Sequence, residues 1–349
     1  MTISVSAPKR IGFFTRLLDD VTPAERYRLA VEQIIKAEEL GFESAWVAQH
    51  HFHESEGGLP SPLVFLSHVA ALTSRIRIGT GIITLPLEDA LRVAEDTAVL
   101  DLLSGGRLEV GVGTGGTASS FTAFGLVSDE RRELFDQKLQ LIIEAWSGKD
   151  LGSVENHLYP PAPHLLDRLW QATFSASGGE RAGRAGDGLM LSRTQPRDAA
   201  AAQAPLDEVQ NPIIDAYLQA LPEGAQPRIL ASRTLFVADD RAEALRLAEA
   251  GLRRILPHFE RQGHVFESNH VESLIAATDS HVGTVEDVVA SLSQDTSLER
   301  VTDISFQVHS IDPPHEHILR SLELTASEVA PRLGWKAAPT PTSALQGEK

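Results

Sequence analysis

A regular alternation of strand-like and helix-like segments, running from residue 10 to residue 333, most constrains the fold of this chain. Short apolar runs are followed by longer segments in which apolar residues recur at helical steps. Consecutive parallel strands need such helical crossovers between them. The expected strands cover residues 10–16, 44–49, 75–85, 107–113, 171–175, 188–192, 228–237 and 303–308.

Eight βα units without a break in composition predict an α/β fold of the (β/α)8 TIM barrel type. In such a barrel the chemistry lies at the carboxyl ends of the strands. A doubly wound open sheet is the structural alternative. The expected helices cover residues 23–40, 62–73, 91–103, 130–146, 180–186, 206–221, 241–259, 284–292 and 316–333.

Two polar segments interrupt this alternation. Residues 147–168 are rich in proline and predict an excursion over the surface, and residues 261–282 form a polar insertion. We expect residues 1–9 to form an N-terminal arm and residues 10–335 the barrel. Residues 336–349 are small, polar and proline-containing, which predicts a disordered tail.

Composition narrows the partners and the location. The formal net charge is −17 and no basic run could follow a phosphate backbone, which argues against nucleic acid as a partner. The chain has no cysteine, so disulfides and thiolate metal sites are excluded. No apolar stretch approaches the roughly 18 residues of a membrane span, and the first residues lack a signal-peptide core. These features predict a soluble, cytoplasmic protein with no membrane partner.

Titratable side chains gather where the second expected strand ends. The sequence SAWVAQHHFHE runs from an apolar strand into Gln49, His50, His51 and His53. Ligands meet parallel sheets at the carboxyl ends of strands, and histidine can exchange protons near neutral pH. A simpler explanation is that one histidine caps a loop while the others are solvated. The cluster is therefore a candidate site that needs support from other strands.

The best candidate for a phosphate site is the SASGG sequence at residues 175–179. It ends a strand and opens a helix, so glycine backbone and serine hydroxyls could hold an anion at the helix N-terminus. An ordinary tight turn explains these residues equally well. Gly111, Gly113 and Gly116 match G-x-G-x-x-G, but this motif does not open a helix directly and is a weak signal.

A zinc site is the second hypothesis, from a different reaction class. His51 and His53 form an H-x-H pair, and His309 and Asp312 from a distant strand could complete a set of ligands. The chain would then be a metal-dependent hydrolase.

Four longer stretches carry a resemblance that covers residues 11 to about 333. They are AEELGFESAWVAQHHF (37–52), RIRIGTGIITLP (75–86), AEDTAVLDLLSGGRLEVGVGTG (94–115) and AGRAGDGLML (182–191). In this order, at these βα positions, the chain resembles the bacterial luciferase-like, flavin-dependent monooxygenases. It looks closest to FMN-dependent members of unassigned substrate.

The resemblance implies a TIM barrel with an insertion between strand seven and helix eight, matching residues 261–282, which is a mobile lid in the family. It implies that reduced FMN, bound as a cosubstrate, reacts with oxygen to give a C4a-hydroperoxide that oxygenates a small organic substrate. A separate NAD(P)H:flavin reductase would supply the flavin, which makes this chain the oxygenase half of a two-component system. Members typically form homodimers through helices two and three.

Carried over residue by residue, the family's catalytic histidine falls on His50. The family's cis peptide, against which the flavin ring packs, falls on Gly81 and Ile82. The phosphate-binding turn falls on residues 175–179, with Ser175, Ser177, Gly178 and Gly179 as the contacts. Gln49, His51 and His53 are weaker candidates for lining the substrate pocket.

Some positions depart from the family's pattern. Gln49 stands where a glutamate is frequent, and Gly113 replaces luciferase's reactive cysteine. Thr114 stands where luciferase has a phosphate-binding arginine, so phosphate binding would rest on Arg193, Arg181 or backbone donors instead, with Thr114 as a further cofactor contact. These changes argue against light emission and a long-chain aldehyde substrate. An F420-dependent oxidoreductase is the rival within this fold, and a non-catalytic flavin-binding role is a further alternative.

Overall fold

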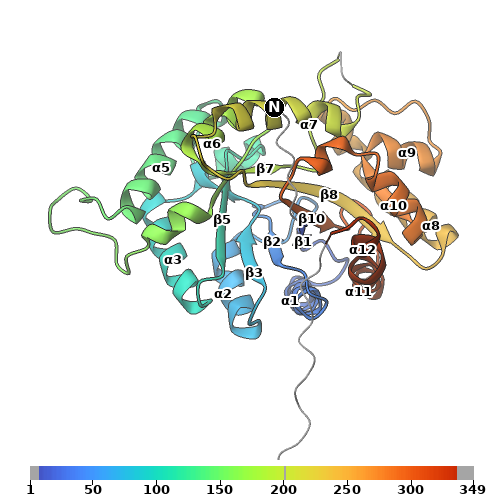
Figure 1. Ribbon diagram of the computed structural model, residues 1–349, viewed down its shortest axis with the longest axis horizontal. Helices are drawn as coiled ribbons and strands as arrows, with labels where there is room; N and C mark the ends of the chain where they lie inside the picture. The colour runs from blue at the N-terminus through green and yellow to red at the C-terminus, as the bar shows by residue number, and fades with distance from the viewer. Residues whose placement is uncertain (1–7, 200–201, 336–349) are drawn as a thin grey trace, which may run out of the picture.

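The computed structural model describes residues 8–199 and 202–335, which form a closed parallel barrel surrounded by helices (Figure 1). Strand β10 pairs with both β1 and β8, and this closes the ring. The predicted (β/α)8 barrel is confirmed, and the open doubly wound sheet is wrong. The wall consists of β1 (Arg10–Thr15), β2 (Ser44–Val47), β3 (Arg77–Thr80) with its continuation β4 (Ile83–Thr84), β5 (Leu108–Gly113), β6 (Leu169–Ala172), β7 (Gly188–Leu191), β8 (Ile229–Val237) and β10 (Asp303–Gln307).

The helices cover the outside of this wall, as Figure 1 shows. Every expected helix is present, although the predicted helix over residues 316–333 is interrupted by a π-helical turn at Thr325–Val329. The short helix α4 (Ala118–Ala123) was not predicted. The helices are α1 (Pro23–Glu39), α2 (Pro62–Leu72), α3 (Ala90–Leu103), α5 (Arg131–Trp146), α6 (Ala176–Ala185), α7 (Leu206–Ala220), α8 (Arg241–Arg261), α10 (Val285–Leu292), α11 (His315–Leu324) and α12 (Ala330–Arg332).

Local sequence explains where several of these helices begin. Thr22 caps α1 by accepting a hydrogen bond from the backbone N–H of Glu25, and Pro23 occupies the first turn. The Glu25 carboxylate accepts hydrogen bonds from Arg28 rather than from the cap residue, so α1 begins without a capping box. A complete capping box occurs instead at α10, between Thr284 and Asp287.

The polar insertion at residues 261–282 is ordered by elements that the sequence did not predict. It contains α9 (Val271–Ala277) and most of strand β9 (Ser280–Gly283). The first half of β8 pairs with β10, whereas its second half pairs with β9, and Thr234 pairs with both Gln307 and Ser280. The insertion is therefore anchored on a strand of the barrel itself.

Apolar side chains form two separate layers in the barrel. A large cluster fills the space between the strands and the surrounding helices. A smaller cluster occupies the interior of the barrel, where the indole rings of Trp46 and Trp170 meet edge to face at 5.8 Å. Its buried members are Phe14, Trp46, Ala48, Trp170, Met190 and Leu230, with Ile82 and Ala172 packed at its rim.

None of the helices in residues 8–199 and 202–335 combines the length and apolar character that crossing a membrane requires. The expected tail at residues 336–349, and the expected arm up to residue 7, lie outside the described residues. The polar excursion at residues 147–168 leaves α5 and returns to the wall through a 3-10 turn at Pro163–Arg168, whose Leu165 is buried.

Candidate functional site

His50 lies directly after β2, at the carboxyl end of the barrel, and its surroundings favour the neutral imidazole. Its Nδ1 lies 3.7 Å from Oε2 of Glu56. Burial and, next, the charge of Arg16 lower the pKa of His50 to about 4, although Glu56 acts in the opposite direction. A Cβ atom at Gly57 would lie 2.6 Å from Cδ2 of the imidazole, so residue 57 must be glycine for the ring to fit here. At neutral pH His50 can therefore accept a proton.

Glu56 connects His50 to a second group of side chains at the barrel mouth. Hydrogen bonding from His50, and then from the Thr117 hydroxyl at 2.7 Å, holds the pKa of Glu56 down at about 2. The backbone carbonyl of Glu56 accepts a hydrogen bond from the guanidinium of Arg16. The backbone N–H of Arg16 in turn donates to Nε2 of His309 over 3.1 Å. The ends of β1, β2 and β10 are thus joined through polar contacts.

Arg193 follows β7 and is only 4% exposed. Its Nη1 donates to Oγ1 of Thr234 at 3.2 Å and to Oγ of Ser310 at 3.1 Å, so the guanidinium turns toward β8 and β10. Burial and the neighbouring Arg16 lower the pKa of Arg193 to about 9. The predicted anion-binding residue is at the mouth, but its contacts lie away from the turn at residues 175–179.

Gln49 has a positioning role in the structure. Its Oε1 accepts a hydrogen bond from the backbone N–H of Thr84 at 2.7 Å, and its Nε2 donates to Glu88 at 2.6 Å and to the carbonyl of Pro60 at 3.0 Å. All of its polar groups are occupied by these contacts. Gln49 therefore fixes the segment that follows β4 to the segment that follows β2.

The two remaining histidines of the cluster have different surroundings. His51 packs against the rings of Phe52 and Phe124, with the latter edge to face at 5.0 Å. His53 lies within 2.7 Å of the Ser119 hydroxyl and is partly exposed. Within the described parts of the chain, no group of three or more His, Cys, Asp or Glu side chains is arranged to hold a metal ion. The zinc hypothesis for His51 and His53 consequently finds no ligand set.

The cis peptide bond expected from the resemblance lies between β3 and β4. The Gly81–Ile82 peptide bond is cis, as the resemblance implied. Ile82 borders the interior cluster that contains Trp46 and Trp170, and a Cβ at Gly113 would lie 3.0 Å from Cδ1 of Ile82. An apolar surface with a glycine opposite Ile82 suits a flat aromatic group at the barrel mouth.

The turn before α6 presents hydroxyls and backbone N–H groups to solvent. Ser175 caps the helix, and its Oγ accepts from the N–H of Gly178 at 3.2 Å and lies 3.2 Å from Oγ of Ser177. The first N–H groups of a helix have no acceptor within it, which leaves those of Ala176 and Ser177 to an external anion. These features fit a phosphate.

The glycines of this turn have packing roles as well. A Cβ at Gly178 would lie 1.9 Å from the Thr173 hydroxyl, and one at Gly179 would lie 2.6 Å from the carbonyl oxygen of Ile213 in α7. Gly183, one turn further along, faces the carbonyl of Tyr217 in the same way at 2.3 Å. Close packing of α6 against α7 thus explains Gly179. Thr114 makes only a weak local contact with Gly115, and nothing in the structure assigns it a specific role.

Sequence reasoning did not single out Glu56, which determines the environment of His50. The signal in the sequence that could have identified Glu56 is its position, since it lies six residues after His50 and is followed by two glycines. Arg233 lies within β8 and takes no part in this site, because it is fully buried and paired with Asp295 at 2.6 Å between Nε and Oδ2.

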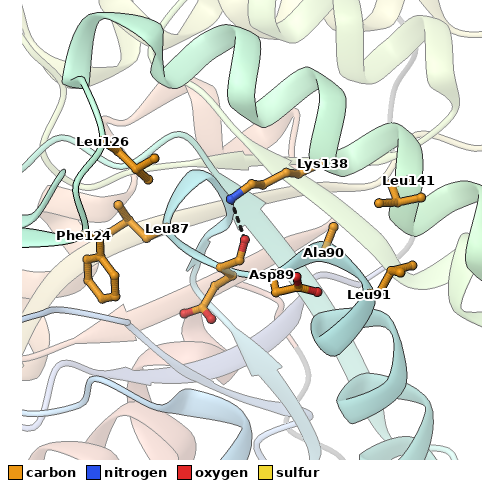
Figure 2. A pocket seen from close by; sticks show the side chains of 9 residues that line it. Leu87, Asp89, Ala90, Leu91, Phe124, Leu126, Lys138 and Leu141 are labelled. Carbon is orange, nitrogen blue, oxygen red and sulfur yellow. Dashed lines mark hydrogen bonds between the residues drawn. The ribbon is translucent and has the colours of Figure 1, made fainter.

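Figure 2 shows a shallow pocket on the flank of the barrel, between the start of α3 and α5. Lys138 points into it, but its amine donates to the carbonyls of Pro86 at 2.7 Å and Glu88 at 2.6 Å. These bonds tie α5 to the segment after β4. The pocket borders the histidine cluster, because its lining residue Phe124 packs on His51 and its lining residue Glu88 accepts a hydrogen bond from Gln49.

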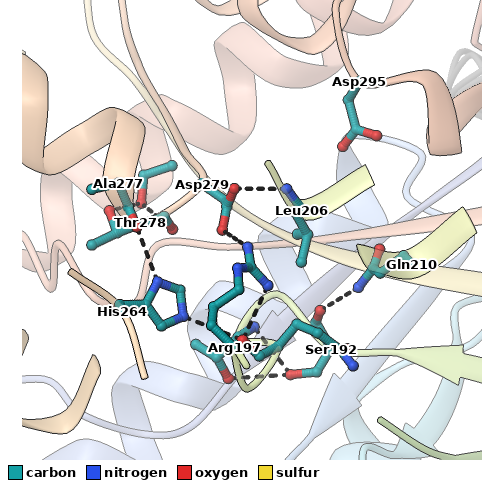
Figure 3. Close-up of polar contacts among 12 residues, drawn as sticks. Ser192, Arg197, Leu206, Gln210, His264, Ala277, Thr278, Asp279 and Asp295 are labelled. Atoms are coloured by element: carbon teal, nitrogen blue, oxygen red, sulfur yellow. Dashed lines mark hydrogen bonds and ion pairs between the residues drawn. The ribbon is translucent and has the colours of Figure 1, made fainter. Parts of the chain in front are cut away.

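Figure 3 shows how the segment after β7 is fastened to the insertion. Arg197 pairs with Asp279 over 2.6 Å between Nη2 and Oδ2, and its backbone N–H donates to the carbonyl of Gln262 at 2.7 Å. His264 bridges the carbonyls of Ala277 and Gln195 at 3.1 and 3.2 Å. We call these four contacting residues, Arg197, Gln262, His264 and Asp279, the insertion clasp.

Comparison with known proteins agrees with this architecture. The chain is similar to monooxygenase RslO1 from Streptomyces bottropensis, with a TM-score of 0.75 and 27% identity over 93% of this chain and 99% of that one. It also shares the fold of the oxygenating constituent of 3,6-diketocamphane monooxygenase from Pseudomonas putida, solved with FMN, with a TM-score of 0.73 and 16% identity over 95% of this chain and all of that one.

A shorter match points to another cofactor. The F420-dependent glucose-6-phosphate dehydrogenase of Kineococcus radiotolerans is 34% identical over 176 residues, which cover 47% of this chain and 52% of that protein. The family profile described as luciferase-like monooxygenase matches residues 10–300. The chain therefore belongs to the luciferase-like monooxygenase family, which includes both FMN-dependent and F420-dependent members.

Proposed function

We propose that this protein is an FMN-dependent monooxygenase that uses reduced flavin and molecular oxygen to oxygenate a small organic substrate. The observation that carries the proposal is the combination, at one end of the barrel, of a neutral, half-buried His50 with an apolar platform and a phosphate-suited turn. A separate NAD(P)H:flavin reductase would supply the reduced flavin, so that the chain acts as the oxygenase component.

Each part of the site has a distinct task in this proposal. Ser175, Ser177 and the free N–H groups at the start of α6 would hold the phosphate. The flavin ring would lie against Ile82 at the rim of the interior cluster. Reduced FMN, when bound, supplies the two electrons that activate oxygen. His50, kept neutral by burial and by Arg16, would accept and return a proton next to the reacting atoms.

Similarity to a monooxygenase supports oxygenation over F420-dependent hydride transfer. The chain is 27% identical to monooxygenase RslO1, against 18% for the F420-dependent tetrahydromethanopterin reductase of Methanopyrus kandleri, and each match covers 93% of this chain. An F420-dependent hydride transfer is the second candidate, and it would require no oxygen.

An anaerobic titration tests the cofactor. The protein is titrated with photoreduced FMN, and in parallel with reduced F420, and air is then admitted. We expect saturable binding of reduced FMN and reoxidation at a rate different from that of free flavin in the same buffer. Binding of F420 alone, with hydride transfer that is indifferent to oxygen, would replace the FMN proposal by the F420 alternative.

The role of His50 is tested by substitution. We expect His50→Ala to retain affinity for reduced FMN and to lose at least 10-fold in oxygenation, because general acid–base residues typically contribute about 10² to 10⁴ in rate. Hydrogen peroxide release per flavin consumed should rise accordingly. His157→Ala is the matched control, since that ring is exposed on the loop after α5, where it lies near Val154 and Asp150. Full coupled turnover in His50→Ala would contradict the assignment.

A further inference from the structure

Arg16 and Arg193 both contact the short segment that follows β10, Arg16 through its backbone and Arg193 through its guanidinium. The backbone N–H of Arg16 donates to Nε2 of His309, and the carbonyl of His309 accepts from the Thr234 hydroxyl at 2.7 Å. That hydroxyl and the Ser310 hydroxyl both accept from Nη1 of Arg193. The two residues are thus linked through His309, and the cations are close enough that the charge of Arg16, after burial, lowers the pKa of Arg193.

These arginines retain hydrogen-bond donors that no described residue uses. Nε of Arg16 is buried without an acceptor in the described part of the chain. Within the same residues, the contacts of Arg193 involve only Nη1, which leaves its Nε and Nη2 without partners. Buried polar groups in native proteins are nearly always satisfied, so the unpaired Nε of Arg16 indicates a ligand with acceptor oxygens.

Nearby carboxylates do not neutralise the pair. Asp312 is hydrogen-bonded to Nδ1 of His309, and its other oxygen lies 3.6 Å from Nη2 of Arg254. The Glu56 carboxylate faces His50 and Thr117. Among the described residues neither Arg16 nor Arg193 has a carboxylate at ion-pair distance. Burying two cations without a direct counterion is costly, and an anionic ligand would relieve that cost.

The pair is placed next to His50 but apart from the phosphate turn. The Glu56 backbone joins Arg16 to the residue that faces His50, and Gly57 packs against the imidazole and the Arg16 carbonyl. Arg193 points toward β8 and β10, whereas the turn at residues 175–179 follows β6. Because FMN carries a single phosphate, a flavin whose phosphate lies on that turn leaves the arginines available for something else.

We propose that Arg16 and Arg193 bind the carboxylate of an acidic organic substrate and hold it beside His50. This inference rests on the proposed function and specifies its substrate class. The planar guanidinium forks offer paired N–H donors to the two oxygens of a carboxylate, which is the geometry that arginine favours. Arg193 would thus recognise the substrate rather than the phosphate of FMN, the role expected for it from the sequence.

Calorimetry with benzoate as the probe tests the proposal in protein saturated with FMN. We expect benzoate to bind the FMN-loaded protein, its neutral methyl ester not to bind, and Arg193→Gln to weaken benzoate binding at least 10-fold. Arg184→Gln is the control, because that arginine is exposed on α6 and pairs only with Glu180. Arg193→Lys, which keeps the charge but loses the fork, should recover part of the affinity.

The ratio of riboflavin to FMN dissociation constants separates the two sources of the anion. If the arginines bind a substrate carboxylate, Arg193→Gln leaves this ratio unchanged, whereas Ser175→Ala with Ser177→Ala lowers it. The proposal is overturned if Arg193→Gln abolishes the preference for FMN, or if the FMN-loaded wild type binds no benzoate. Arg193-dependent benzoate binding without any FMN binding would preserve the anion site and refute the proposed function instead.

Arg16→Gln serves as a second variant, and thermal unfolding of both variants confirms that they are folded. Loss of benzoate binding in folded Arg193→Gln, with FMN affinity retained, supports the proposal even if Arg16→Gln does not fold. Unchanged benzoate affinity in folded Arg193→Gln overturns it.

Discussion

At the scale of single residues, the protonation of His50 follows from two neighbours that act in opposite directions. Arg16 disfavours the imidazolium and Glu56 favours it, while burial adds to the effect of Arg16. With a pKa of about 4, His50 stays neutral from pH 5.5 upward, whereas an unperturbed histidine would titrate near 6.5.

A histidine titration by NMR checks this balance. We expect Arg16→Gln to raise the pKa of His50 toward 6.5 and Glu56→Gln to lower it, since the first variant removes a cation and the second an anion. The lowered pKa also implies that His50 opposes folding increasingly as the pH falls from 6.5 to 4, because only the unfolded state takes up a proton there. A midpoint near 6.5 in the wild type would contradict this account.

The histidine cluster shows how far sequence reasoning reached at this scale. The apolar run before Gln49 was enough to predict that polar groups gather at the end of the second strand. It could not predict how far each histidine would be buried, because this depends on contacts with Gly57 and Phe124 that form only in the folded chain. The convergence of Arg16 with Arg193 was equally hidden, since it depends on the closure of β1 against β10.

At the scale of elements, the insertion clasp sets the position of the segment after β7. The Arg197 side chain is 1% exposed and Asp279 is 11% exposed, so breaking their pair leaves a buried charge. Burial raises the pKa of Asp279 to about 6 despite the arginine, so this carboxyl is ionised at pH 8 and largely protonated at pH 5.

Arg197→Met should therefore destabilise the protein more at pH 8 than at pH 5. Removing one partner of a buried pair costs about 3–5 kcal/mol, and protonation of Asp279 removes the unpaired charge below its pKa. Urea unfolding at both pH values measures the difference. Adding Asp279→Asn should abolish the pH dependence, and asparagine tolerates the positive φ of 49° at this position. Equal destabilisation at both pH values would argue against the clasp.

The barrel elements were predictable because the wall is buried on both sides, and continuous apolar runs mark each strand. Strand β9 and helix α9 could not be predicted, since they are short and lie in a segment of polar composition. They are held in place by pairing with β8 and by the insertion clasp, which are contacts between residues distant in sequence.

At the scale of the whole molecule, α2 and α3 expose an apolar surface that the barrel does not cover. It comprises Val64 and Leu72 of α2 with Val99, Leu102 and Leu103 of α3. Contiguous exposed apolar residues commonly mark protein interfaces. We propose that two copies of the chain pair through this surface, as the family resemblance implied.

Light scattering after gel filtration tests this pairing. The wild type should have the mass of a dimer, and Leu102→Glu with Leu103→Glu should have that of a monomer, because charges would be buried at the interface. Val154→Glu is the control, since that residue is also exposed but lies on the loop after α5. A wild-type monomer would refute the proposed dimer.

The double pairing of β8 has a consequence for how this fold can diversify. Thr234 is the point where one strand passes from the barrel wall to the insertion, because its partners are Gln307 on one side and Ser280 on the other. The loops that flank α9 can lengthen or shorten while β9 keeps its register on β8. New substrate-facing segments can thus be acquired over evolution without rebuilding the catalytic scaffold beneath them.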